Sequence, residues 1–335
     1  MYAILLASLA LTTLTTAFAV TLYARRLGAQ RRRGAARAAL ALVEPIALDL
    51  LEGEAPADPP AEHEAALAES LSRLAPIVTG DTRAVIARHF ESTGAIERAC
   101  RRLADPRPHI RASTAAQLGD MCSDLAELPL LQALHDRDPD VRLAAARSLG
   151  RLKTRPAAAL LLNSLVRREV PRAVATGALL SIGAAALPGV RQLLTHSHHR
   201  ARADAVELLG LLGNPADSML LQERLGDDTA AVRSRACHAL RRLGAHDAKQ
   251  AVESALADPE AEVRAASAEA LGHLGDRESA AVLIHAAQND DADVARAAAE
   301  SLVQIAPAFA ERIASSSNAS PQIRRAARVP AGDPT

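Results

Sequence analysis

The sequence of 335 residues has no tryptophan, and its aromatic side chains are two tyrosines and three phenylalanines. A core with so few aromatic residues consists of Leu, Val and Ala, which suits stacked helix pairs better than one large globular core. The three cysteines, Cys100, Cys122 and Cys237, have neither disulfide nor metal-ligand spacing. We therefore expect them to be reduced thiols packed in the core, as in a cytoplasmic protein.

Acidic residues are absent from the first 43 positions, although the chain as a whole carries 39 basic and 39 acidic residues. Six arginines lie in that first stretch, so the remainder holds 33 basic and 39 acidic residues. A mildly acidic body without tryptophan is a poor match for nucleic acid. We therefore predict no nucleic-acid partner.

Leucine recurs every 30 or 31 residues across more than half of the chain. Self-similarity at a period of this size is typical of a solenoid, in which each unit buries its apolar face against its neighbours. The predicted repeat core is Leu118, Leu149, Leu179, Leu209, Leu240, Leu271 and Leu302.

Charged residues recur in register with these leucines. An arginine stands seven residues before six of the seven, at Arg111, Arg142, Arg172, Arg202, Arg233 and Arg264, and Ala295 takes its place in the last unit. Six residues before the arginine stand Asp105, Asp136, Asp227 and Asp258, with Asn289 in the last unit.

Each unit contains two amphipathic helices. Val232, Ala236, Ala239, Leu240 and Leu243 have the spacing of one helix face. A second, shorter apolar pattern precedes this helix in each unit. The sequence therefore predicts an all-α fold of helix pairs.

Proline, aspartate and glycine mark the helix ends. Asp-Pro pairs at 105–106, 138–139 and 258–259 favour helix starts, because aspartate caps a helix and proline suits its first turn. Four residues after the leucine stand Gly183, Gly213, Gly244 and Gly275, where we expect left-handed helix ends.

The pattern Asp-Pro-x-x-x-Val-Arg followed seven residues later by Leu-Gly resembles HEAT repeats, in particular the short bacterial kind also found in phycobilisome lyases. Residues 258–272, DPEAEVRAASAEALG, carry it best. The resemblance covers 95–306 and implies that the Asp and Arg columns form a hydrogen-bonded ladder between repeats. Because Val166 and His196 replace Asp, we expect the ladder to be weak there. A phosphate-binding stripe is the competing interpretation of the arginines, and the missing aromatic platforms disfavour it.

Residues 3–24 carry no charge, and twenty-two helical residues span about 33 Å, enough to cross a bilayer core of ~30 Å. Five lipid-facing arginines follow directly: Arg25, Arg26, Arg31, Arg32 and Arg33. The positive-inside rule then predicts one transmembrane helix in the inner membrane with the repeats in the cytoplasm. The alternative is a signal peptide cleaved near Ala19, which would export the solenoid.

The predicted organisation has six parts. They are a transmembrane anchor at 1–24, a basic juxtamembrane helix with a Pro-rich acidic spacer at 25–62, degenerate capping helices at 63–94, seven repeats at 95–306, a degenerate cap at 307–328 and a disordered tail at 329–335.

Sites for chemistry are scarce in the sequence. His196 and His199 have metal-ligand spacing, but the cluster with His198 reads better as a solvated turn. Deoxyhypusine hydroxylases resemble the chain in their repeats, yet they need several His-Glu pairs, and the sequence has only His63-Glu64. We predict no enzyme activity, no cofactor, no metal and no small-molecule ligand. A lyase- or hydroxylase-type enzyme acting on a protein stays the alternative.

The combined prediction is a membrane-anchored cytoplasmic scaffold or adaptor. Anchor, spacer and solenoid together favour a protein partner, a membrane-associated enzyme or complex, because solenoids offer long surfaces to extended partners.

Overall fold

The computed structural model describes residues 26, 38–52, 64–316 and 319–328, and it contains no strand within them. The chain forms two compact units, Met1–Pro129 and Leu130–Thr335. The helices of the first unit are α2 (Glu64–Leu74), α3 (Asp81–Ser92), α4 (Ala95–Arg102) and α5 (Pro108–Asp120), preceded by a helix over 38–52, and α6 (Glu127–Ala133) crosses the boundary.

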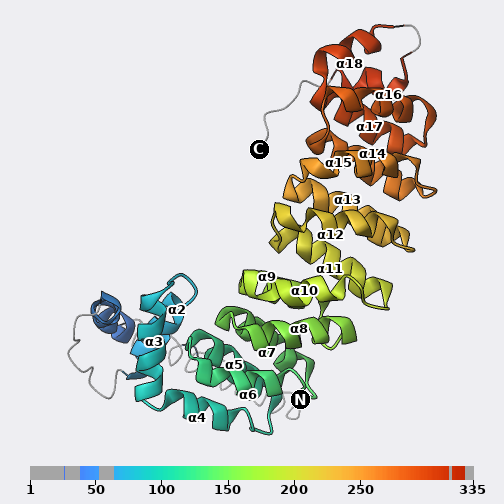
Figure 1. The fold of residues 1–335 in the computed structure, drawn as a ribbon. Helices are drawn as coiled ribbons and strands as arrows, with labels where there is room; N and C mark the ends of the chain where they lie inside the picture. Colours follow the sequence, from blue (N-terminus) through green and yellow to red (C-terminus); the bar gives the residue numbers. More distant parts are fainter. Residues whose placement is uncertain (1–25, 27–37, 53–63, 317–318, 329–335) are drawn as a thin grey trace, which may run out of the picture. The chain divides into compact units, whose positions relative to one another are not determined.

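The second unit is a stack of helix pairs in chain order (Figure 1). Its helices are α7 (Pro139–Leu152), α8 (Arg155–Arg167), α9 (Arg172–Ile182), α10 (Leu187–Leu193), α11 (His199–Leu212), α12 (Ser218–Glu223), α13 (Ala230–Leu243), α14 (Lys249–Ser254), α15 (Ala261–Leu274), α16 (Ala280–Asn289), α17 (Ala292–Ile305), α18 (Pro307–Ala314) and α19 (Pro321–Ala326). Odd-numbered helices from α7 to α19 pack in one row, and each even-numbered helix from α8 to α18 packs on the odd-numbered one that follows. The predicted all-α solenoid is confirmed.

The core of the second unit is a seam of leucine, valine and alanine. In α15, Val263, Ala270 and Leu271 are fully buried, because they share the helix face that meets α13 and α17. The repeat leucines of this unit have 0% exposure: Leu149, Leu179, Leu209, Leu240, Leu271 and Leu302. Leu118 on α5 of the first unit is equally buried. The fold therefore places one large apolar anchor of each repeat at its centre.

Small residues let neighbouring helices of the row approach closely. At Gly210 in α11, an added Cβ atom would lie 2.7 Å from Cβ of Ala239 in α13. Such a contact is far shorter than van der Waals separation, so a side chain at 210 would push the two helices apart. The Leu-Gly step of the repeat pattern thus reflects tight stacking.

Two expectations about helix ends hold only in part. Only Asp138 caps its helix, by accepting a hydrogen bond from Asp140 N; α5 and α15 begin later, at Pro108 and Ala261. Gly183 and Gly244 have positive φ, whereas Gly213 and Gly275 are extended. At Gly213 the requirement is for space, because an added Cβ would lie 2.4 Å from Leu209 O.

One stretch of the described residues, Arg172–Leu193, is long and apolar enough to cross a membrane, by length and composition only. It corresponds to α9 and α10, which a left-handed break at Gly183 (φ 72°) separates. Both halves pack on other repeat helices, so this stretch belongs to the solenoid. The predicted anchor at 3–24 lies outside the described residues.

The first unit is built around a small apolar cluster. Leu67 and Leu71 of α2 and Ile86 and Phe90 of α3 are almost fully buried. Helix α3 packs on α4, and α5 contacts both α2 and α4. In the preceding helix over 38–52, Val43 and Ala47 are fully buried.

Candidate functional site

The arginine column joins each repeat to the next in the second half of the stack. The Arg202 guanidinium donates to both carboxylate oxygens of Asp227, at 2.7 and 2.9 Å, and Arg233 donates to Asp258 at 2.7 and 2.8 Å. Both pairs are largely shielded from solvent. Each arginine thus binds the loop carboxylate of the following repeat.

The backbone of the same loop also accepts a hydrogen bond from the arginine of its own repeat. Arg233 Nη1 donates to the carbonyl oxygen of Asp227 at 2.9 Å, while Asp227 Oδ1 accepts from Thr229 N at 3.0 Å. Asp258 repeats both contacts, with Arg264 and with Glu260 N. The aspartate therefore turns the chain into the next helix and carries the inter-repeat bond.

At the two ends of the repeat region the partners differ from the expected columns. Arg264 binds Asp290 at 2.8 Å and Asp291 at 3.0 Å, one and two residues after Asn289. Asp105 is bound by Arg107 of its own loop at 3.0 Å, and its carbonyl oxygen accepts from Arg111. The expectation that every ladder partner stands six residues before the next arginine is therefore wrong at both ends of the repeat region.

The ladder uses other partners where Val166 and His196 stand in place of aspartate. Arg142 Nε donates to the backbone carbonyl of Glu169 at 2.9 Å instead of to a carboxylate. Arg172 Nε reaches Asp204 Oδ1 at 2.6 Å, and Arg172 Nη2 reaches Glu207 Oε2 at 2.5 Å. Because both acids lie on α11, the link between α9 and α11 is made helix to helix.

Histidine takes over the turn-forming role of aspartate at His196. Its Nδ1 accepts from His198 N at 3.0 Å, and His198 Nδ1 accepts from Arg200 N at 3.2 Å as the N-cap of α11. The rings of His198 and His199 stack with centroids 5.0 Å apart. An acceptor Nδ1 must be unprotonated, so the turn depends on neutral imidazoles.

We expect His198→Asp to make the protein less sensitive to mild acid. Partial desolvation, and then the charges of His199, Arg200, His196 and Arg168, lower the pKa of His198. Since an unfolded histidine titrates near pH 6.5, the cap's contribution is present above that pH and is lost as the pH falls toward the folded pKa. Aspartate is a good N-cap and keeps its charge to a pH near 4. Urea midpoints at neutral and mildly acidic pH measure the difference, with His199→Gln as control; equal losses in all three proteins would contradict the role of His198.

A groove of about 590 Å³ lies on the row of odd-numbered helices. Three helices contribute the residues that line it. They are Ser234 and His238 of α13; Ala261, Glu262, Ala265, Ala266 and Glu269 of α15; and Asp291 and Asp293 at the start of α17. The small side chains of Ala265 and Ala266 leave the space open. The repeat columns of the sequence do not reveal this groove, because its residues become neighbours only when α13, α15 and α17 stack.

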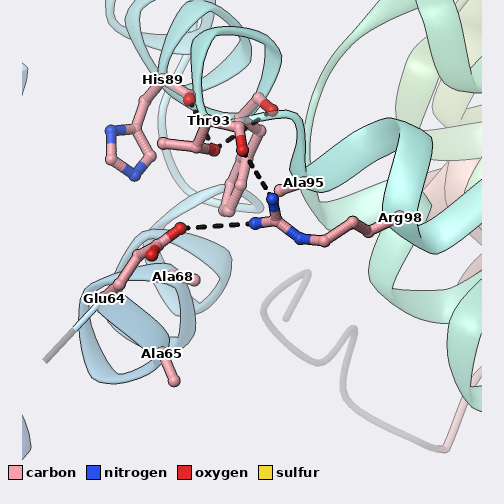
Figure 2. Close-up of a pocket in the computed structure, with 8 residues that line it drawn as sticks. Glu64, Ala65, Ala68, His89, Thr93, Ala95 and Arg98 are labelled. Atoms are coloured by element: carbon pink, nitrogen blue, oxygen red, sulfur yellow. Dashed lines mark hydrogen bonds and ion pairs between the residues drawn. The ribbon is translucent and has the colours of Figure 1, made fainter. Parts of the chain in front are cut away.

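A second hollow, of about 400 Å³, lies in the first unit. Arg98 of α4 donates to Thr93 O at 2.7 Å and to Glu64 Oε1 at 3.3 Å, as Figure 2 shows. Burial lowers the pKa of His89 on the rim, against the opposing effect of Glu64. The charges of Arg98 and Glu64 balance each other, so the hollow offers a ligand no unpaired charge.

Reactive side chains are few in the described part of the chain. Burial raises the pKa of the Cys237 thiol to about 12, so Cys237 is a packed thiol and a poor nucleophile. Within that part, no group of three His, Cys, Asp or Glu side chains is placed to hold a metal ion. The predicted lipid-facing residues Arg25, Arg31, Arg32 and Arg33 lie outside it, and Arg26 is exposed.

A sequence model of HEAT repeats matches residues 96–182, 166–241 and 218–303. Among solved structures, the chain is similar to the complex of CpcE and CpcF of phycocyanin lyase from Nostoc sp. PCC7120, with 23% identity over 69% of this chain and 85% of that one and a TM-score of 0.30. Human deoxyhypusine hydroxylase in complex with glycerol is 19% identical over 80% and 97%, with a TM-score of 0.33. Importin beta is 15% identical over 84% and 44%, with a TM-score of 0.48. None of these structural likenesses bears on activity or partners. No curated protein sequence matches the chain significantly.

Proposed function

The chain belongs to the HEAT-repeat family, and from this premise we propose that it is a scaffold that binds another protein along the stacked helices of its second unit. The observation that supports the proposal is the unbroken row from α7 to α17, which carries an open groove on α13, α15 and α17. Stacked repeats offer a long surface on which an extended partner makes many contacts. The proposal includes no enzymatic step.

We further propose that residues 3–24 hold this scaffold at the inner membrane with its repeats in the cytoplasm. The support comes from the sequence, an uncharged stretch of membrane-spanning length followed at once by arginines. Tethering raises the effective concentration of the solenoid near membrane proteins, which strengthens binding without any new contact. The partner is then a membrane-associated enzyme or complex.

Affinity capture from detergent-solubilised membranes tests the scaffold. The tagged full-length chain is expected to retain one protein in stoichiometric amount, and a variant lacking residues 3–24 should move to the soluble fraction and retain less of it. Recovery of the full-length chain alone, as a monomer, would count against a scaffold.

Reporter fusions at the C-terminus test the topology. Because the arginines after residue 24 favour the cytoplasmic side, a fused green fluorescent protein should fluoresce and a fused alkaline phosphatase should be inactive. The opposite pair of results would support the exported solenoid. Replacing Arg25, Arg26, Arg31, Arg32 and Arg33 by glutamine is the matched variant, and it should weaken the cytoplasmic preference.

A further inference from the structure

The groove on α13, α15 and α17 is strongly acidic. Its lining includes four carboxylates, from Glu262, Glu269, Asp291 and Asp293, and no lysine or arginine. Acidic residues in the first turn of a helix are often present because they interact favourably with the helix dipole. Glu262 and Asp293 occupy such positions. Glu269 lies further along α15, so the dipole does not account for the whole set.

Two of the four carboxylates have no partner among the described residues. Glu262 and Asp293 are exposed and make no hydrogen bond or ion pair within that part of the chain. Asp291 is bound by Arg264 at 3.0 Å. Glu269 Oε2 lies 3.9 Å from His238 Nδ1. Burial lowers the pKa of His238, with Arg241 and Arg242 adding to the effect and Glu269 and Glu262 opposing it, so the ring is neutral at pH 7 and balances no charge.

The lining of the groove includes a serine hydroxyl that makes no hydrogen bond to the described part of the chain. Ser234 is only 4% exposed and lines the groove, yet its hydroxyl has no hydrogen-bond partner among the residues that the structure describes. The fully buried polar atoms without a partner do not include the Ser234 oxygen, so this oxygen reaches the space of the groove, where a ligand or water can bind it. Beside it, Ala265 and Ala266 offer an apolar surface.

We propose that this groove binds lysine or arginine side chains from an extended segment of the partner protein. The apolar floor fits the methylene stem of such a side chain, while the carboxylates and the Ser234 hydroxyl accept from its charged head. Glu262 and Asp293 belong to different helices, so a segment with several cations fits better than a single ion. Nucleic acid is repelled by the same charges. The inference rests on the scaffold function and names the chemistry of its partner.

Peptide binding to the full-length protein in detergent tests the inference directly. The probe is a fluorescein-labelled peptide of alternating arginine and serine, measured by fluorescence anisotropy, with a glutamate-serine peptide as its counterpart.

Glu262→Gln with Asp293→Asn should lower the affinity for the arginine peptide about tenfold, because each exposed charge pair contributes modestly. Ser234→Ala should lower it about threefold to tenfold. The control Glu223→Gln with Glu311→Gln removes the same net charge outside the groove and should leave the affinity unchanged.

The outcomes separate this inference from the scaffold function. Loss of peptide affinity in the groove variants but not in the control supports the inference. Equal affinity in the wild-type protein, the groove variants and the control overturns it, as does tighter binding of the glutamate peptide. If the membrane capture still retains a partner while the groove variants bind the peptide normally, the scaffold stands and only the groove assignment fails.

Discussion

Leu240→Ala is expected to lower the free energy of unfolding by about 2–5 kcal/mol. Leu240 has 0% exposure in the last turn of α13, which packs between α11 and α15 in the row. Truncation removes buried apolar area and leaves a cavity that the neighbouring helices cannot fully close. Urea denaturation followed by circular dichroism measures the loss, and Leu271→Ala in α15 should behave alike.

Hydrogen exchange should show where the cost of Leu240→Ala falls. Because each repeat contacts only its neighbours, faster exchange is expected in α12 and α13 first, then in α11 and α15. Arg242→Ala is the matched control on the same helix, since Arg242 is exposed and such changes cost well under about 1 kcal/mol. Similar losses for Leu240→Ala and Arg242→Ala would mean that the helix register is wrong.

The neighbouring Arg241 shows a limit of the sequence pattern. The helical register predicts an exposed side chain at this position, yet Arg241 is half-buried and its Nε is buried without a hydrogen-bond partner. Spacing along one helix gives the direction of a side chain, but the cover that adjacent repeats provide depends on how they stack. Arg241 is therefore the poorer control.

The repeat core could be predicted from the sequence because leucine burial depends only on helical period. The partners in the arginine ladder could not, because they depend on the path of each loop. Asn289 holds the column position, but α16 continues to that residue, and the chain turns only at Asp290. Likewise, Arg172 lacks a loop carboxylate and turns to Asp204 and Glu207 on α11.

The groove escapes sequence analysis for a related reason. Ser234, Glu262 and Asp293 are about thirty residues apart, and none occupies a column that recurs in every repeat. Their common site arises from the stacking of α13, α15 and α17, together with alanines that leave room between the larger side chains. Features shared by all repeats are visible in the sequence, whereas features of one joint need the packed structure.

Asp227→Ala is expected to cost about 2–4 kcal/mol, the second large effect, because it leaves the Arg202 guanidinium without its main partner in a shielded joint. The Asp227 side chain is 3% exposed and that of Arg202 is 11% exposed. The substitution also removes the acceptor for Thr229 N, which turns the chain into α13. Asp227→Asn separates the two roles, since it keeps a turn-forming oxygen and removes the charge.

Arg202→Ala and the double variant complete a thermodynamic cycle with Asp227→Ala. A coupling energy of about 1–3 kcal/mol is expected for a pair in direct contact. Arg202 also contacts Asp228 and the carbonyl oxygens of His196 and Ser197, so its own replacement removes more than one bond. Additive losses in the cycle would show that the Arg202–Asp227 pair contributes no coupling energy to this joint.

Acid provides an independent measure of the same bond. Burial disfavours ionisation of Asp227, but hydrogen bonds from Arg202 and Thr229 N outweigh it and lower its pKa to about 2. An unfolded aspartate titrates near pH 3.9, so the contribution of this carboxylate is complete above about pH 5 and is lost as the pH falls toward 2. Hydrogen bonds from Arg233 and Arg264 lower the pKa of Asp258 and Asp290 in the same direction. The stability gap between wild type and Asp227→Asn should therefore close between pH 5 and pH 2, and a gap that persists unchanged at low pH would assign it to the turn geometry instead of the charge.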